Sequence, residues 1–273
     1  MQDQFSRTQM LIGKPALDTL KGSRVAVFGV GGVGGYVVEV LVRSGVGELA
    51  LIDNDRVCIT NINRQIIATL SQVDRLKVDV CEERIRDINP HCIVHKYPMF
   101  YLPQNADTID LSAYDYVVDC IDTITAKLEL IRRCHELQVP VISSMGAANK
   151  MDPTAFRVTD IFKTNMDPLA KIIRKKLRKL NIHHLKVVYS EEVPLDPILY
   201  PELMEEDLSV NTSETEVQNL SQEASQDATK NNNTNTRRRS IPASNAFVPA
   251  AAGLVCGGEV IKDLIRKAGT ERK

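Results

Sequence analysis

Three glycines stand where a chain could approach a phosphate group. Gly29, Gly31 and Gly34 form the pattern Gly-x-Gly-x-x-Gly between an apolar run and a helical pattern. Glycine lets the backbone come close to a phosphate, and the positive end of the following helix then points at it. Asp53 follows the next apolar run, about twenty residues further on, where an acidic side chain can bind a ribose hydroxyl. The sequence therefore predicts a nucleotide site, which NAD and ATP would both satisfy.

The residues after the second apolar run distinguish between these nucleotides. The stretch "DNDRVCITNINRQ" and the start of the next helical pattern carry five further polar side chains: Asp55, Asn61, Arg64, Gln65 and Lys77. A hydride-transfer site needs an apolar slot for nicotinamide. Arginine and lysine beside the phosphates instead match the charge of a triphosphate and of a departing pyrophosphate. The cluster favours ATP, and an NAD-dependent oxidoreductase is kept as an alternative.

A second acidic signal lies in "YVVDCIDTITAK". Asp119 and Asp122 fall at the C-terminal end of an expected parallel strand, the edge at which open α/β sheets bind ligands. A carboxylate there can hold Mg²⁺ between phosphate oxygens. The alternative is that either residue caps the following helix. The presence of Arg64 and Lys77 favours the magnesium interpretation.

The elements that must position these residues follow from hydrophobic patterning. Short β-branched runs alternate with longer helical patterns, which is typical of a parallel sheet with crossover helices. We expect strands at residues 25–28, 49–52, 93–97, 116–120 and 139–143, and helices at 33–43, 76–88 and 123–137. Residues 151–164 predict a hairpin or an edge strand. The expected fold class is α/β: a Rossmann-like, mostly parallel sheet with flanking helices, ending in extra strands and a C-terminal helix.

Composition limits the class of protein. The chain has 273 residues, 43% of them hydrophobic, and its 34 basic and 35 acidic residues leave a net charge of −1. One substantial core is expected, and affinity for nucleic acid must come from a local patch. The six cysteines form no Cys-x-x-Cys pair, so we expect reduced thiols instead of a zinc ribbon or a redox dithiol. Residues 1–13 have no secretory pattern, which predicts a cytoplasmic protein.

A local basic patch is present on one predicted helix. Asp167 is suited to cap this helix and Pro168 to begin it. Its apolar side chains fall on one face, and much of the remainder is basic, including Lys171, Arg174, Lys175 and Arg178. From spacing alone, such a face indicates either a solvated helix surface or a contact surface for nucleic-acid phosphates.

The composition also predicts the domain organisation. Residues 195–239 are acidic and then rich in Ser, Thr, Gln and Asn, which favours a disordered insertion. Residues 1–194 and 240–273 would together form one ATP-binding domain. Residues 244–265 are rich in Ala and Gly but carry three charges, which favours a buried or dimer-facing helix over a membrane span.

Taken together, these motifs resemble the family of ubiquitin-activating and molybdopterin- or thiamine-biosynthesis adenylyltransferases. The resemblance covers residues 24–122 and implies a role for each matching position. The glycine turn, here also including Gly32, would bind the nucleotide with Asp53 and Asp55. Asn61, Arg64 and Lys77 would contact the phosphates. Gln65 would support the nucleotide pocket, and Asp122 would bind Mg²⁺.

The N-terminal stretch "FSRTQ" resembles a further segment of that family. The resemblance implies that Arg7 reaches the triphosphate of the other subunit in a homodimer, although Thr8 departs from the pattern. The catalytic residues would then be Arg7, Arg64, Lys77 and Asp122. A surface arginine without such a role is the alternative.

One branch of the family is resembled more closely. The stretches "TNINRQI", "VISSMGAANKMDPT" and "VTDIFKTNMDPLA" look like the tRNA threonylcarbamoyladenosine dehydratases. This implies an enzyme that uses ATP and Mg²⁺ to adenylate the carboxylate of threonylcarbamoyladenosine in tRNA, after which the modified base closes a ring with loss of water. The partners implied are this tRNA, a second copy of the chain and proteins of a sulfur-transfer system, with no membrane.

Two further alternatives stay open. One is an adenylyltransferase for the C-terminus of a sulfur-carrier or ubiquitin-like protein. It is disfavoured because zinc-binding Cys-x-x-Cys pairs and an obvious acceptor cysteine are missing. The other is a tRNA-binding scaffold that senses ATP without turning it over.

Overall fold

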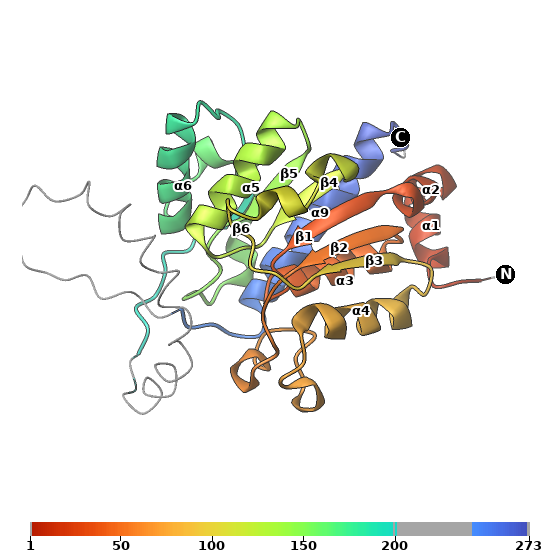
Figure 1. Ribbon diagram of the computed structural model, residues 1–273, viewed down its shortest axis with the longest axis horizontal. Coiled ribbons are helices and arrows are strands. Elements are labelled where there is room, and N and C mark those ends of the chain that lie inside the picture. Colours follow the sequence, from red (N-terminus) through yellow and green to blue (C-terminus); the bar gives the residue numbers. More distant parts are fainter. Residues whose placement is uncertain (1, 199, 201–241, 272–273) are drawn as a thin grey trace, which may run out of the picture. The chain divides into compact units, whose positions relative to one another are not determined.

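The computed structural model describes residues 2–198, 200 and 242–271 (Figure 1). The chain divides into two units, Met1–Pro194 with Ser244–Lys273, and Leu195–Ala243. The insertion predicted at residues 195–239 lies outside the described residues, apart from 195–198 and 200. The functional residues predicted above all fall in the first unit.

The first unit is built on a seven-stranded sheet with the order β3-β2-β1-β4-β5-β7-β6. Its strands are β1 (Arg24–Phe28), β2 (Glu48–Ile52), β3 (Ile93–Tyr97), β4 (Tyr116–Asp119), β5 (Val141–Ser144), β6 (Phe156–Asp160) and β7 (Lys186–Ser190). Every neighbouring pair is parallel except β6 and β7, so β6 is an antiparallel edge strand. The mostly parallel α/β sheet and the edge strand within residues 151–164 are confirmed.

Seven helices flank the sheet in the described part of the chain. They are α1 (Ser6–Ile12), α2 (Lys14–Gly22), α3 (Gly34–Arg43), α4 (Lys77–Ile88), α5 (Ile124–Glu136), α6 (Pro168–Lys179) and α9 (Val248–Lys267). Single 3-10 turns occur at Ile59–Asn61, Leu70–Gln72, Ala106–Thr108, Leu111–Ala113, Pro153–Ala155 and Ile161–Lys163. Hydrophobic patterning predicts all of these helices except α1 and α2, which together cover residues 6–22.

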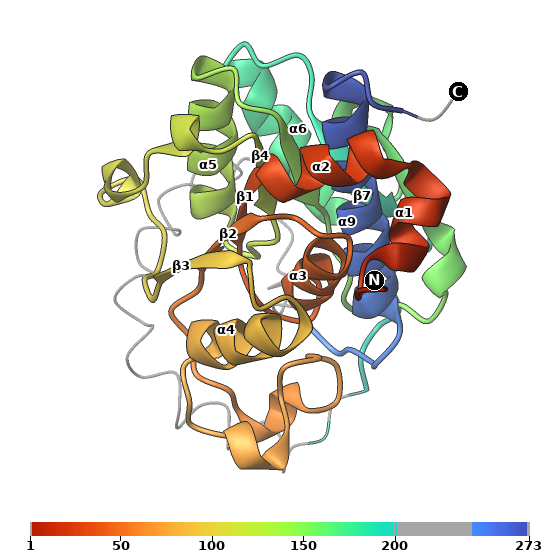
Figure 2. The same cartoon turned by 90° about the vertical axis from the view of Figure 1, so that its right-hand side faces the viewer.

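Side chains that alternate along the strands bury both faces of the sheet. Val25 and Val27 of β1 pack with α3, α4 and α9 on one face, whereas Ala26 and Phe28 pack with α5 and residues 101–114 on the other. Helix α6 forms a further cluster with α5 and β7 (Figure 2). Burial on both faces explains why the strands are continuous apolar runs in the sequence.

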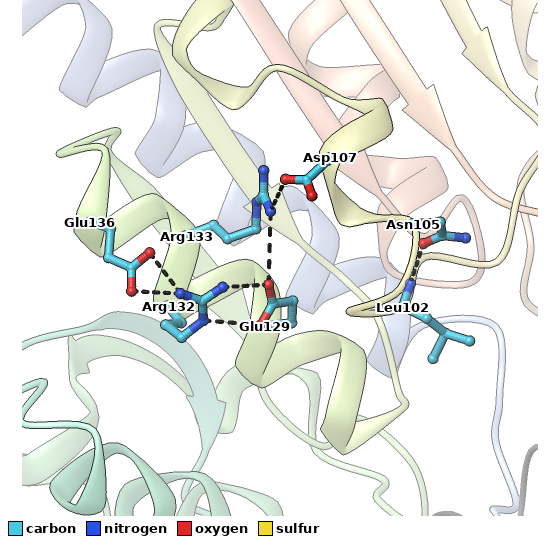
Figure 3. Close-up of polar contacts among 7 residues, drawn as sticks. All are labelled: Leu102, Asn105, Asp107, Glu129, Arg132, Arg133 and Glu136. Atoms are coloured by element: carbon cyan, nitrogen blue, oxygen red, sulfur yellow. Dashed lines mark hydrogen bonds and ion pairs between the residues drawn. The ribbon is translucent and has the colours of Figure 1, made fainter.

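Helix α5 is also held on its outer side (Figure 3). Arg133 Nη1 donates to Asp107 Oδ1 at 2.7 Å, which ties α5 to the connection between β3 and β4. Arg132 lies between Glu129 and Glu136, three residues before it and four after it on the same helix. These exposed or half-exposed pairs contribute little stability individually but fix the rotamers of the charged side chains.

Helix α9 packs closely against α3. A Cβ atom at Gly253 would lie 2.4 Å from Val33 O, and one at Gly257 would lie 2.8 Å from Val40 Cβ, so glycine is needed at both positions. The prediction of a C-terminal helix is confirmed, and within residues 2–198 and 242–271 no helix is both long and apolar enough to span a bilayer.

Two residues attach the flanks of the 195–243 segment to one loop. The Glu192 carboxylate accepts from the backbone nitrogens of Met151 and Asp152, each at 2.8 Å. Asn245 Nδ2 donates to Lys150 O at 2.8 Å. The loop after β5 is therefore held by residues on both sides of that segment.

Candidate functional site

The strand register brings the predicted site residues to one edge of the sheet. Phe28 is paired with Ile52 on one side and with Asp119 on the other, and Asp119 is paired with Ser143. The residues that follow each of these positions therefore emerge side by side at the C-terminal ends of the strands. The order β3-β2-β1-β4-β5 places the topological switch point between β1 and β4, where open α/β sheets bind ligands.

The glycine turn serves two separate purposes. Gly29 has φ = 87° and leads out of β1, and a Cβ atom at Gly34 would lie 1.7 Å from Gly29 O. These two glycines let α3 start directly behind the strand. A Cβ at Gly31 would have Gln65 Nε2, 3.8 Å away, as its nearest neighbour. Gly31 therefore leaves the backbone open for close approach by a ligand.

Asp53 lies under this turn and is linked to Lys77. Its two carboxylate oxygens accept from the backbone nitrogens of Val30, at 2.7 Å, and Asp55, at 2.9 Å. Lys77 begins α4, is buried, and places Nζ 2.6 Å from Asp55 Oδ2 and 4.0 Å from Asp53 Oδ1. Burial raises the pKa of Asp53, and the charge of Lys77 opposes that rise. The ammonium group is thus held beside the ribose and phosphate positions expected from the sequence.

The segment after β2 supplies the remaining predicted nucleotide contacts. Asn61 is buried and its Oδ1 accepts from Cys58 N at 3.2 Å. Arg64 is half-buried, and its Cγ would lie 3.3 Å from a Cβ at Gly32. Gln65 is buried, and its Oε1 has no hydrogen-bond partner among the described residues. A buried acceptor without a donor fits a site that a hydrogen-bonding ligand completes.

The two acids after β4 have different surroundings. Asp119 is fully buried and accepts from Lys127 Nζ at 2.7 Å. Asp122 is exposed, and Thr123 Oγ1 donates to it at 3.4 Å. The residue that precedes α5 is Thr123, and no side chain caps this helix end. Asp122 is therefore not a helix cap and stays available to a cation.

Patterning does not single out Lys127 as a site residue. The sequence feature that could have identified it is its position on the apolar face of α5, with the buried residues Ala126, Leu130 and Ile131. A charge on the buried face of a helix needs a partner. The partner, Asp119, lies eight residues earlier on the adjoining strand.

Arg7 lies at the opposite end of the sheet from the glycine turn. It is exposed on α1, which is fixed by the buried Phe5 beside Gly45, near the start of β2. Figure 2 shows α1 and α2 at the end where β1 begins. The structure does not bring Arg7 together with Arg64 and Lys77 of its own chain.

The basic helix α6 has one inward-facing and several outward-facing charges. Asp167 Oδ1 accepts from Ala170 N at 2.8 Å, so the predicted helix cap is confirmed. Arg174 Nη1 donates to Ile161 O and Thr164 O, at 3.1 and 2.8 Å. The exposed basic side chains are Lys171, Lys175, Arg178 and Lys179. Arg174 therefore anchors the helix, and the outward charge lies on its neighbours.

Most of the cysteines are buried in the described part of the chain. All six are free thiols, and Cys81, Cys92, Cys134 and Cys256 are buried. Burial raises the pKa of Cys81 and of Cys134 to about 12. Such thiols stay protonated near neutral pH and are poor nucleophiles.

The fold and this edge define a nucleotide-binding protein of the adenylyltransferase type. The chain matches the ThiF family over residues 5–272, and it belongs to this family. The resemblance to adenylyltransferases drawn from the sequence is thereby confirmed.

The relatives narrow the family to one branch. The chain is 44% identical to the tRNA threonylcarbamoyladenosine dehydratase of Bacillus subtilis (strain 168), covering 100% of this chain and 98% of that protein. It is similar to the crystal structure of the Escherichia coli tRNA N6-threonylcarbamoyladenosine dehydratase TcdA in complex with AMP, with a TM-score of 0.79, 30% identity, and coverage of 97% of this chain and 96% of the other. For the complex of the same enzyme with ATP, the TM-score is 0.76 at 30% identity, over 97% and 95% of the two chains. The predicted resemblance to this branch is confirmed.

Proposed function

We propose that this protein is a tRNA threonylcarbamoyladenosine dehydratase that uses ATP to cyclise the modified base. The observation that carries the proposal is the arrangement at the β1–β4 edge. An open glycine turn and a buried lysine lie beside Asp53, Arg64 packs against Gly32 of the turn, and an exposed carboxylate follows β4. Full-length similarity to a dehydratase supports the choice of substrate.

The first step is attack by the substrate carboxylate on the α-phosphate of ATP. The carboxylate oxygen forms a bond to phosphorus, and the bond to pyrophosphate breaks. Negative charge that develops on the phosphates is stabilised by Lys77 and Arg64. Lys77 is paired with Asp55 in the structure, so it must turn toward the phosphates when ATP binds, before the chemical step.

The second step closes the ring. The carbamoyl group of the same nucleoside attacks the activated carbonyl carbon, AMP leaves, and the overall change is loss of one water. The nucleophile is already tethered, so the step gains from proximity and needs no protein nucleophile. The buried, protonated thiols of the described chain agree with this.

Asp122 is the residue that would hold Mg²⁺. It is exposed, does not cap α5, and lies next to the switch point. No three His, Cys, Asp or Glu side chains in the described ranges cluster as a metal site, so phosphate oxygens and water would supply the other ligands. When bound, the ion neutralises phosphate charge and orients the triphosphate.

A homodimer completes the site in this proposal. Arg7 is exposed on helix α1, which lies at the end of the sheet where β1 begins and not at the glycine turn (Figure 2). Helix α9 also presents apolar side chains to solvent, with Phe247 43% and Leu254 50% exposed. We place the enzyme in the cytoplasm with its tRNA, and an association with sulfur-transfer proteins stays a prediction.

Helix α6 is the proposed contact for the tRNA backbone. Lys171, Lys175 and Arg178 face outward, while Arg174 secures the helix to the preceding segment. Lysine and arginine on an exposed face bind phosphates without reading sequence.

A single reaction tests the proposed function. The protein is incubated with ATP, Mg²⁺ and tRNA carrying threonylcarbamoyladenosine, and the digested nucleosides are analysed by mass spectrometry. A nucleoside lighter by one water, with AMP and pyrophosphate released, is the expected result. Binding of ATP without this product would instead indicate a scaffold, and a carrier protein joined to AMP would indicate the sulfur-carrier alternative.

A further inference from the structure

A buried polar network lies directly beneath the proposed catalytic edge. Asp119, Lys127 and Ser143 are each 0% exposed. Lys127 Nζ donates to Asp119 Oδ2 at 2.7 Å, to Ser143 Oγ at 3.1 Å and to Ser144 O at 3.0 Å. Ser143 Oγ in turn donates to Asp119 Oδ2 at 2.5 Å. The three donors of the ammonium group are therefore all used.

Stability alone gives a weak reason for such a network. Removing two charges from water costs several kcal/mol per ion, and their mutual attraction often only offsets that loss. A pair of apolar residues of similar volume would serve the core at least as well. We therefore look for a role of the network in the adjacent nucleotide site.

The network joins three pieces of backbone that meet at the C-terminal edge of the sheet. Asp119 Oδ1 accepts from Ile121 N at 3.1 Å, which fixes the residue directly before Asp122. Ser144 O is the last carbonyl of β5, where the loop at residues 145–152 begins. Lys127 lies in the first turn of α5, so one ammonium group connects the ends of two strands and the start of a helix.

The same backbone also supports the glycine turn. A Cβ atom at Gly29 would lie 2.7 Å from Cys120 O, so residues 120–121 are packed against that turn. Asp122 itself receives a weak hydrogen bond from its neighbour Thr123. The position of its carboxylate is consequently set by the backbone that the network holds.

We propose that Asp119 and Lys127 are positioning residues that hold the Asp122 carboxylate and the start of the 145–152 loop in register with the glycine turn. This inference rests on the proposed function, because it assigns Asp122 to the Mg²⁺–ATP complex. It predicts that the network acts on the metal-dependent step and contributes little to folding.

The test replaces both charges at once, in the variant Asp119→Leu/Lys127→Met. The double change leaves no unpaired charge, so the free energy of unfolding should stay the same or rise. In ATP–pyrophosphate exchange measured with tRNA that carries threonylcarbamoyladenosine, kcat should fall about tenfold or more, and the Mg²⁺ concentration for half-maximal rate should rise. The Kd for ATP without Mg²⁺ should not change. Ser143→Ala, which removes one hydroxyl, should give a smaller effect in the same direction.

The matched control removes an ion pair that the same helix makes away from the network. Asp107→Ala removes one carboxylate partner of Arg133 of α5, does not touch the network, and should leave kcat and the Mg²⁺ dependence at wild-type values. A double variant or a Ser143→Ala variant with wild-type kcat and Mg²⁺ dependence would overturn the inference.

A second measurement does not depend on activity. Hydrogen exchange at residues 120–125 and 145–148 should accelerate in both network variants, while α3 stays protected. Unchanged exchange there would also overturn the inference. Wild-type protein that shows no exchange of pyrophosphate would instead count against the proposed function.

Discussion

At the scale of single residues, the site is a set of charges held by backbone geometry. Asp53 binds two backbone nitrogens, and Lys77 is buried between the carboxylates of Asp53 and Asp55. Lys77 is thus paired with carboxylates of its own chain, and a triphosphate must replace Asp55 as its partner.

Lys77→Ala should reduce ATP–pyrophosphate exchange at least about a hundredfold, because the charge on the leaving pyrophosphate loses its preorganised partner. Exchange of labelled pyrophosphate into ATP measures this. Lys96→Ala is the control, since Lys96 pairs with Asp79 and Glu82 away from the site. Retention of most of the activity by Lys77→Ala would remove it from the proposed role.

Acidification should weaken nucleotide binding through Asp53. Its pKa is raised by burial, so it is protonated at a higher pH than an ordinary aspartate, and the neutral carboxyl binds ribose hydroxyls and Lys77 less well. The Kd for ATP, measured by calorimetry, should therefore rise more steeply as the pH falls in the wild type than in Asp53→Asn, and the rise should begin at a higher pH than an ordinary aspartate would give. Parallel curves for the two proteins would contradict this assignment.

The sequence predicts residues whose role is local and misses those defined by packing. Gly29, Gly34 and Asp53 follow from spacing because one turn and one strand end position them. Lys127 is missed because its partners Asp119 and Ser143 meet it through the pairing of β4 and β5. The inward role of Arg174 is missed for the same reason, since helical periodicity does not show which acceptors lie beneath a basic residue.

At the scale of elements, α6 combines an anchoring side and a charged side. The Asp167 cap and the Arg174 contacts fix the helix, and Arg178 lies over the ring of Phe162 at 5.6 Å. The expected strands and helices are largely found because short apolar runs mark the buried strands and a helical hydrophobic period marks the helices. Helices α1 and α2 are not predicted because they are short and pack as one small unit against α9 and the start of β1.

Replacing Lys171, Lys175 and Arg178 with glutamine should weaken tRNA binding and lower the slope of log Kd against log salt by about 2. Filter binding across a salt series measures both. A triple glutamine variant at Lys14, Lys96 and Lys262 removes the same charge elsewhere and should leave the slope unchanged. Equal slopes in the two triple variants would favour a merely solvated α6.

At the scale of the whole molecule, the proposed site needs residues from two chains. Helix α1, which carries Arg7, lies at the end of the sheet where β1 begins (Figure 2), whereas Arg64 packs against Gly32 and Lys77 binds Asp55, both of which follow the C-terminal ends of strands. The apolar surface of α9 is the face we propose for the second copy.

Mixing two inactive variants tests this arrangement. In a mixed dimer of Arg7→Ala and Lys77→Ala, one site has an intact Lys77 and receives Arg7 from the partner. With random reassembly, about a quarter of the wild-type activity should return. Activity that stays absent after subunit exchange, verified by native mass spectrometry, would place Arg7 outside the partner's site.

The attachments of Glu192 and Asn245 to the loop after β5 have a topological consequence. Glu192 and Asn245, which flank the 195–243 segment, bind the same loop at residues 150–152, so the two ends of that segment are held close together. Doubling the length of such a segment costs only about 0.6 kcal/mol of closure entropy. A change in the length of this stretch, or a reporter inserted there, should therefore leave the geometry of the seven-stranded sheet unchanged.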